Sequence, residues 1–327
     1  MEIDELTELV LSGNRRALAR AITLVESRRD DHRSAAETMQ ARLRDANRRA
    51  LRIGLTGTPG VGKSTFIEAF GLHLTALGLR VAVLAVDPSS ARTGGSILGD
   101  KTRMPLLSRD KNAYIRPSPS NSALGGVAEQ TRAVIEVCEA AAFDVILVET
   151  VGVGQSETLV AGMTDIFTLL IAPAGGDELQ GVKRGIMELA DLVLVNKADG
   201  DLKAQATRTA ADYAGALRLM RASPDNPADY PKVLTMSATE GTGLDTAWEA
   251  MRDLADWRDE AGITTARRAR QRMDAFATAS NRAMTEYLET APDLAALRAR
   301  IEAEVASGRQ SPESAARSFI AAVFAGV

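Results

Sequence analysis

Two kinds of hydrophobic periodicity follow one another along the chain, and the first is helical. From residue 1 to about 48, apolar residues recur at spacings of three and four, as at Leu6, Leu9 and Val10. Such spacings place side chains on one face of a helix. The polar segment Ser12-Gly13-Asn14 interrupts the pattern and predicts a break between two helices. We therefore expect residues 1–48 to form a helical N-terminal extension.

Short apolar runs alternate with helical stretches between residues 49 and 258. The runs predict strands at Leu51–Gly57, Val81–Asp87, Ala113–Arg116, Asp144–Thr150, Ile166–Ala172, Leu192–Val195 and Val233–Ser237. Near-continuous apolar strands that are separated by helices are typical of a parallel sheet covered on both faces. We expect an α/β fold with a doubly wound, mainly parallel sheet in this domain.

After Trp257 the pattern is helical again. It predicts three helices, over about 265–289, 293–307 and 311–325, with Gly308 as a stop and Ser311-Pro312-Glu313 as a start. The Arg-rich stretch 267–272 is expected to be a solvated helix face. Residues 259–327 cannot easily bury their own apolar side chains, so they either pack on the core or form an arm for self-association. We favour a dimerisation arm.

Composition and charge narrow the class of protein. The chain has 327 residues, of which 45% are hydrophobic and 25% charged, as in an ordinary globular protein. A net charge of -4 argues against a general nucleic-acid-binding surface. No apolar run reaches the roughly 18 residues that a membrane span requires. The start Met-Glu-Ile-Asp-Glu has the opposite charge to a secretory leader, so we expect a cytoplasmic protein without nucleic-acid or membrane partners.

The chain contains one cysteine and two histidines. Cys138 cannot form an internal disulfide, and its apolar helical surroundings predict a buried structural thiol. His32 and His73 lie in unrelated segments. They predict neither a metal cluster nor a His-based catalytic triad.

The strongest functional signal is the glycine-rich segment Gly57–Thr65, which fits G-x-x-x-x-G-K-[ST] between a predicted strand and a predicted helix, Ser64–Leu77. Its backbone N–H groups can face phosphates, and the helix N-terminus adds positive potential. We expect Lys63 to reach the β- and γ-phosphates, Ser64 to bind Mg²⁺ and Thr65 to bond the α-phosphate. The other expected nucleotide-binding residues of this loop are Gly57, Pro59, Gly60, Val61 and Gly62. The motif predicts a magnesium-dependent P-loop NTPase.

A second loop suggests which base is bound. Asn196-Lys197-Ala198-Asp199 follows a predicted strand, at the edge where open α/β sheets bind nucleotides. Asp199 can accept two hydrogen bonds from N1–H and the N2 amino group of guanine, which adenine lacks. We expect Asn196 to join this loop to the phosphate loop, the Lys197 stem to lie over the base, and Ser237-Ala238 to contact guanine O6. A solvated turn is the alternative, but the combination predicts GTP and GDP as ligands.

Acidic residues end two of the strands beside the phosphate loop. Mg²⁺ prefers a few carboxylate oxygens, often through water, so Asp87 and Glu149 are candidate ligands, although either could be a strand-end cap. The polar loop 88–104 is a candidate switch, with Asp100 as a further metal or water ligand; a loop without a role is the alternative. The expected metal ligands are Ser64, Asp87, Asp100 and Glu149.

The segment Glu149-Thr150-Val151-Gly152 has the spacing of the D-x-x-G element of G proteins, with Glu in place of Asp. The Gly152 N–H is expected to sense the γ-phosphate. Val153 stands where many small GTPases have the Gln that orients water, and Gln155 comes two positions later. We therefore predict slow intrinsic hydrolysis.

Three segments together closely resemble the MeaB/ArgK family of G-protein chaperones: Asp87–Met104, Arg116–Ser120 with Gly125-Gly126, and Val148–Glu157. The resemblance spans about residues 50–200 and extends through Ser237. Members of this family serve adenosylcobalamin-dependent acyl-CoA mutases, typified by methylmalonyl-CoA mutase. The resemblance implies a homodimer with a helical arm, partner-stimulated GTP hydrolysis, gated delivery of the cofactor, and protection or reactivation of the mutase.

The family also has a third switch, which matches Gly175–Lys183. From the residues alone, Gly175-Gly176 is a strand-to-helix turn. The resemblance implies that Gln180 and Lys183 communicate with the partner or stimulate hydrolysis. With these two, the expected catalytic residues are Lys63, Asp100, Glu149, Gln180 and Lys183.

Two rival functions remain open. A metal-insertion GTPase, as in hydrogenase or urease maturation, uses Cys and His for its metal, and this chain has one Cys and two separated His. An ATP-driven accessory to amino-acid transport is the other alternative. Asp199 argues against ATP in that case, and no apolar run suggests a membrane segment.

Overall fold

The computed structural model describes residues 2–27, 29–86, 103–116, 124–150, 156–173, 184–220 and 223–325. The internal contacts divide the chain into two units, Met1–Gln271 and Arg272–Val327. The expected domain boundaries near residues 48 and 258 therefore remain a prediction.

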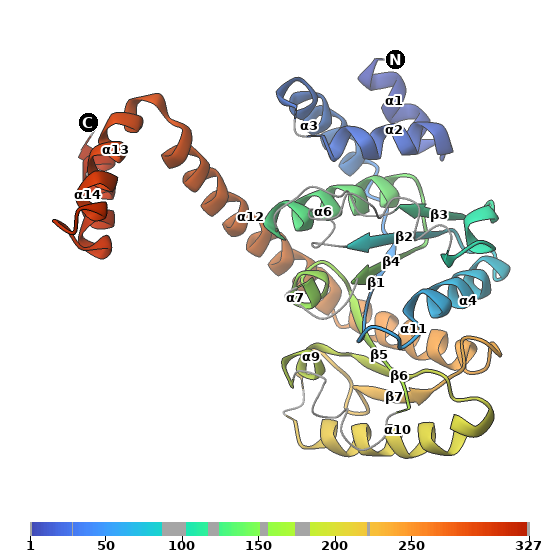
Figure 1. The fold of residues 1–327 in the computed structure, drawn as a ribbon. Helices are drawn as coiled ribbons and strands as arrows, with labels where there is room; N and C mark the ends of the chain where they lie inside the picture. Colours follow the sequence, from blue (N-terminus) through green and yellow to red (C-terminus); the bar gives the residue numbers. More distant parts are fainter. Residues whose placement is uncertain are drawn as a thin grey trace. The chain divides into compact units, whose positions relative to one another are not determined.

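A single sheet forms the centre of the first unit (Figure 1). Its strands are β1 (Leu51–Thr56), β2 (Val81–Val86), β3 (Ala113–Arg116), β4 (Val145–Thr150), β5 (Ile166–Ile171), β6 (Leu192–Val195) and β7 (Lys232–Thr235). All pairings are parallel, in the order β3-β2-β4-β1-β5-β6-β7. Each expected strand is present within a residue or two of its predicted ends. The α/β prediction is therefore confirmed.

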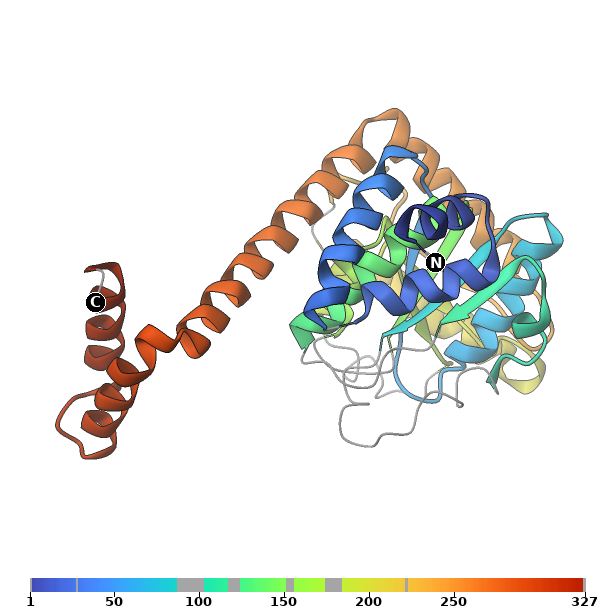
Figure 2. The same ribbon diagram turned by 90° about the horizontal axis from the view of Figure 1, so that it is seen from above.

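Within the described residues, seven helices contribute to one side of the sheet. They are α1 (Ile3–Leu11), α2 (Arg15–Val25), α3 (Asp30–Asp45), α6 (Leu124–Ala140), α7 (Ser156–Ala161), α9 (Arg184–Leu189) and α10 (Lys203–Arg218). Figure 2 shows α1, α2 and α3 together over α6, which they contact. Cys138 is fully buried in this core, and burial raises the pKa of its thiol, which confirms the expected structural cysteine.

The N-terminal extension has three helices instead of the two that were expected. The first break is as predicted: the Asn14 side chain caps α2 by accepting hydrogen bonds of 3.0 Å from the backbone N–H groups of Arg16 and Ala17. The second break follows α2 at Glu26, before α3 begins at Asp30. The intervening residues include neither Gly nor Pro, so this break has no turn signal in the sequence.

The opposite side of the sheet carries α4 (Lys63–Ala76), the short 3₁₀ helix η2 (Leu107–Arg109) and α11 (Leu244–Glu260). A further 3₁₀ turn, η3 (Gly200–Leu202), leads into α10. Strand side chains alternate between the two faces. In β4, Ile146 and Val148 join the first core, whereas Val145 and Leu147 join the second. Glu149 follows the second set, so it lies on the face that α4 covers.

The second unit is helical. It holds the later part of α12 (Ile263–Thr290), then α13 (Pro292–Ala306) and α14 (Pro312–Ala325), close to the expected bounds. The helices α13 and α14 pack against each other, with Leu294 and Leu297 buried. Across the described ranges, no helix combines the length and apolar character that crossing a bilayer requires.

The expectation of a solvated face over residues 267–272 is wrong for Arg268. The residue is 8% exposed, and its side chain donates hydrogen bonds of 2.8 and 2.6 Å to the Asp165 carboxylate. It also donates to Glu139 at 3.2 Å and to the Ala50 carbonyl at 2.7 Å. The start of α12 therefore packs on the sheet edge, where Arg268 compensates the charge of these buried carboxylates.

Candidate functional site

The phosphate-loop sequence connects the carboxyl end of β1 to the first turn of α4. Two of its glycines are sterically required. A Cβ at Gly57 would lie 2.4 Å from the Leu170 carbonyl oxygen. A Cβ at Gly62, whose φ is +91°, would lie 2.8 Å from Nδ2 of Asn196. The loop therefore approaches both β5 and the segment after β6 too closely for any larger residue.

Lys63 lies inside this loop and is 8% exposed. Its Nζ donates hydrogen bonds to the carbonyl oxygens of Gly57 at 2.6 Å and Thr58 at 3.3 Å. Burial lowers the pKa of Lys63, while the nearby carboxylates of Glu149 and Glu157 act in the opposite direction. The loop thus encloses an ammonium group close to two buried carboxylates.

Asn196 joins three segments of the site. Its Nδ2 donates to the Val61 carbonyl oxygen at 2.9 Å, and its Oδ1 accepts from the Ala238 N–H at 3.0 Å. Lys197, which has a φ of +59°, extends its Nζ to the Gly60 carbonyl oxygen at 2.7 Å. These contacts hold the loop after β6 against the phosphate loop on one side and the segment after β7 on the other.

Asp199 is fixed by the segment that follows β7. The Ser237 hydroxyl donates to the Asp199 carboxylate and accepts from the Glu240 N–H at 3.1 Å. The Ala198 N–H donates to the Met236 carbonyl at 2.9 Å. The Asp199 carboxylate, half-buried, is therefore held at the same sheet edge as the phosphate loop.

Of the residues predicted to bind Mg²⁺, the described ranges contain one hydroxyl and one carboxylate. Ser64 lies in the first turn of α4, and Glu149, 6% exposed, lies at the end of β4. Within the described ranges there is no group of three or more His, Cys, Asp or Glu side chains that could hold a metal. Hydroxyl and carboxylate oxygens suit Mg²⁺, which keeps several waters and takes substrate phosphate oxygens as ligands. The residues present fit that ion.

Several predicted site residues lie outside the described ranges: Asp87, Asp100, Gly152, Gln180 and Lys183. The structure also shows a contact that sequence reasoning missed. Thr150 Oγ1 donates to Thr56 Oγ1 at 2.9 Å, and both side chains are buried. This pair joins the ends of β4 and β1 directly before Gly57. A polar residue at the last position of two adjacent apolar strands was the available signal.

The sheet is all-parallel, and a glycine-rich loop lies at its carboxyl edge. A second loop at the same edge is bonded to the first by an asparagine. This combination defines a P-loop protein of the GTPase type. The family described as "Methylmalonyl Co-A mutase-associated GTPase MeaB" matches residues 18–293. The chain belongs to this MeaB family, and it is a GTPase.

Individual relatives agree with this assignment. A putative GTPase of Caulobacter vibrioides is 52% identical over 324 residues, which cover 99% of this chain and 98% of the relative. The "Methylmalonic aciduria type A homolog, mitochondrial" of Mus musculus is 46% identical over 96% of this chain and 78% of its own length. A solved structure titled "Crystal structure of LAO/AO transport system kinase" superposes with a TM-score of 0.77 at 35% identity, covering 98% of this chain and 97% of that one.

Proposed function

We propose that the chain binds GTP with Mg²⁺ at the carboxyl edge of the sheet. In this arrangement, residues Gly57–Thr65 surround the phosphates, and Asn196, Lys197, Asp199, Ser237 and Ala238 surround the guanine. The observation that supports this assignment best is the position of Asn196, which is bonded to Val61 of the phosphate loop and to Ala238. A single asparagine thereby sets the spacing between the two halves of the nucleotide site.

Lys63 has a proposed electrostatic role at the phosphates. Its amine is enclosed by the loop and donates to two loop carbonyl oxygens, so it lies inside the segment that is proposed to surround the phosphates. Since burial disfavours its charged form, an anionic ligand would recover part of that cost. Backbone N–H groups at the start of α4 would add further donors.

Ser64 and Glu149 would hold the magnesium ion, with Asp87 and Asp100 as further ligands proposed from the sequence. When bound, Mg²⁺ neutralises charge on the β- and γ-phosphates. Within the chain, the Thr56–Thr150 hydroxyl pair joins the end of β4 to the end of β1 directly before the phosphate loop, which would keep Glu149 beside that loop. The Gly152 N–H is proposed to sense the γ-phosphate, and slow hydrolysis is proposed because Val153 replaces the water-orienting Gln.

The guanine assignment can be tested at Asp199. In Asp199→Asn, the side chain presents one donor and one acceptor in place of two acceptors, so it mismatches guanine and fits xanthine. We expect GTP affinity to fall on the order of 100-fold or more while affinity for xanthosine triphosphate rises. Competition binding against a fluorescent guanine nucleotide measures the affinity for GTP and the affinity for xanthosine triphosphate. Asp201→Asn, two positions further along and exposed, is the matched control. Equal affinity of the unaltered protein for ATP and GTP would refute the assignment.

We also propose that the chain is a G-protein chaperone of an adenosylcobalamin-dependent acyl-CoA mutase, with methylmalonyl-CoA mutase as the first candidate. In this role it gates cofactor delivery and protects or reactivates the mutase. The family description, which associates its members with methylmalonyl-CoA mutase, supports the proposal. Gln180 and Lys183 are proposed to transmit the nucleotide state to the mutase.

Affinity capture with and without a non-hydrolysable GTP analogue tests this role. We expect a cobalamin-dependent mutase to be retrieved in an amount that depends on the nucleotide. Lys183→Ala is expected to retain GTP binding but to lose the stimulation of hydrolysis by the mutase, whereas Lys63→Ala is expected to lose GTP binding itself. If no cobalamin enzyme is captured in either nucleotide state, the chaperone proposal is wrong.

A further inference from the structure

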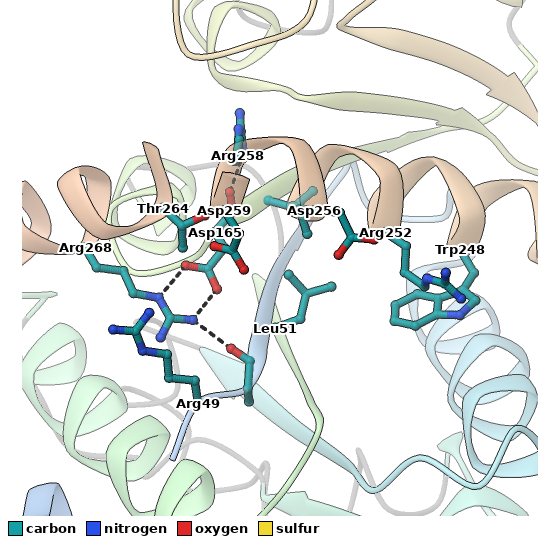
Figure 3. Close-up of a pocket in the computed structure, with 13 residues that line it drawn as sticks. Arg49, Leu51, Asp165, Trp248, Arg252, Asp256, Arg258, Asp259, Thr264 and Arg268 are labelled. Atoms are coloured by element: carbon teal, nitrogen blue, oxygen red, sulfur yellow. Dashed lines mark hydrogen bonds and ion pairs between the residues drawn. The ribbon is translucent and has the colours of Figure 1, made fainter. Parts of the chain in front are cut away.

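A cavity of about 310 Å³ lies at the sheet edge opposite the phosphate loop (Figure 3). Leu51 and Ile166 line it, and these are the first residues of β1 and β5. Gly57 follows the last residue of β1, so the strands themselves separate this cavity from the nucleotide site. The remaining walls come from the connection before β1, from α11 and from the start of α12. All of these segments belong to residues 1–271.

One wall of the cavity is a closed network of buried charges. Arg268 donates to both oxygens of Asp165 and to the Ala50 carbonyl (Figure 3). Arg258, 2% exposed, donates to the Asp191 carboxylate and to the Asp165 carbonyl. Burial lowers the pKa of the Arg268 guanidinium, but the carboxylates of Asp165 and Glu139 outweigh this effect and raise it. These charges compensate one another, so they do not require a ligand.

The other charged groups of the cavity are not compensated in this way. Arg49 and Arg252 line it and are exposed, and within the described ranges neither has an ion pair or a hydrogen bond from its side chain. The lining also contains two exposed carboxylates, Asp256 and Asp259, and in the described part of the chain neither forms an ion pair with Arg49 or Arg252. Both guanidinium groups therefore keep their N–H donors free for an anionic group.

Apolar side chains form part of the lining near these two arginines. Figure 3 shows Arg49 and Arg252 on opposite sides of Leu51, with the Trp248 ring beside Arg252. Ile166 and Ala255 add further apolar lining. The volume is at the lower end of the roughly 300–1,000 Å³ that ligand sites occupy, so the matching ligand is small. Its charge should be at both ends and its apolar part in the middle.

We propose that this cavity is a binding site for a small dicarboxylic acid. One carboxylate pairs with Arg49 and the other with Arg252, and the hydrocarbon segment lies over Leu51. Arginine suits this task because its planar guanidinium binds a carboxylate through two hydrogen bonds. Such a ligand would contact the connection before β1 and helix α11 simultaneously, and would stabilise both.

Trp248 provides a direct test. The chain contains two tryptophans, so Trp257→Phe leaves Trp248, inside the cavity, as the sole indole fluorophore. This protein is titrated with dicarboxylates from succinate to adipate, and with hexanoate and hexylamine as singly charged probes. We expect saturable fluorescence changes with at least one dicarboxylate, binding about tenfold weaker with hexanoate because one charged contact is lost, and none with hexylamine.

Single substitutions in the same background locate the site. Arg49→Gln and Arg252→Gln are each expected to weaken dicarboxylate binding about tenfold. Asp256→Asn is expected to strengthen it, because a repelling carboxylate is removed, and a purely structural effect would not do so. Arg208→Gln, at an exposed position of α10 outside the cavity, is the control and is expected to change nothing.

Three results would overturn the proposal: no saturable change with any dicarboxylate, equal affinity for hexanoate and the best dicarboxylate, or undiminished binding when both arginines are replaced. GTP affinity is measured on the same variants and is expected to be unchanged. A failure at this cavity is thereby distinguished from a failure of the guanine assignment at the other sheet edge.

Discussion

Gly60 and Gly62 lie two residues apart in the phosphate loop, with φ angles of +87° and +91°. Their surroundings differ: a Cβ at Gly60 would meet no atom within 4 Å, whereas a Cβ at Gly62 would collide with the Asn196 amide. The same backbone conformation therefore serves two purposes. At Gly60 it shapes the loop, and at Gly62 it also makes room for the asparagine that joins the two halves of the site.

This pair supports a prediction for the nucleotide-free protein. Gly60→Ala is expected to lower the free energy of unfolding by about 1 kcal/mol, the strain of a left-handed alanine. Gly62→Ala should cost about 2–4 kcal/mol, because the bond from Asn196 to Val61 is also displaced. Urea unfolding of both variants measures the difference. If the two variants were equally stable, Asn196 would not be held by the loop as the structure shows.

Residues in local motifs were predictable, and residues whose role depends on distant partners were not. The glycine spacing and the order of strand and helix identify Gly57–Thr65 without any structure, because all the interacting atoms belong to one segment. Arg268 is the opposite case. Its partners Asp165 and Glu139 are 103 and 129 positions away along the chain, so an Arg-rich helix looked solvated.

At the scale of elements, the strands were predicted well because both faces of the sheet are covered, which makes each strand a continuous apolar run. The three last helices were found from start and stop residues such as Pro312 and Gly308. The break before α3 was not predicted because the residues there include no Gly or Pro. Side-chain contacts are found at this break. There, the Ser27 hydroxyl lies 2.8 Å from Nδ1 of His32, a contact that apolar periodicity does not encode.

The attachment of α12 to the sheet provides a second prediction. Arg268→Met removes the cation and leaves Asp165 and Glu139, both below 9% exposure, with fewer partners. We expect the free energy of unfolding to fall by about 3–5 kcal/mol, as when one partner of a buried ion pair is removed. Arg270→Met, two residues further along α12, is the control. Arg270 is exposed and lies 3.7 Å from Asp225, so its removal should cost at most about 1 kcal/mol.

Thermal and denaturant unfolding of the two variants check this expectation. A loss at Arg268 no larger than that at Arg270 would contradict the importance of the buried network. GTP affinity adds a second comparison. The network lies at the beginning of the strands, away from the phosphate loop, so Arg268→Met should retain GTP binding at temperatures where the protein remains folded.

At the scale of the whole molecule, the two ends of the parallel strands have different roles. The carboxyl ends of β1, β4, β6 and β7 bring the glycine loop, Glu149 and the asparagine loop together. The opposite ends of β1 and β5 hold the buried charges and the cavity, together with the root of α12. Both arrangements follow from strand direction, because residues that end separate strands meet at one edge, however far apart they are in the sequence.

The exposed apolar side chains of α12 support a third prediction, for the assembly. Met273, Phe276, Met284 and Tyr287 are each more than half exposed, and their spacings of three, eight and three residues place them on one face of the helix. Large exposed apolar side chains that share one helix face are typical of an interface. We propose that this face forms the homodimer contact that the family resemblance implies, and we expect the unaltered protein to be a dimer.

Charge placed on this face should separate the two subunits. The double variant Phe276→Arg/Tyr287→Arg is expected to be monomeric by size-exclusion chromatography with light scattering, because two buried guanidinium groups per subunit would lack partners. Thr278→Arg/Thr285→Arg adds the same charge to the opposite face of α12 and should stay dimeric. A monomeric unaltered protein, or dimers of the first variant, would refute the assigned interface. Since residues 272–327 contribute no proposed nucleotide ligand, GTP affinity should be the same in the dimer and in the monomeric variant. A loss of GTP binding on dissociation would instead mean that the nucleotide site depends on the second subunit.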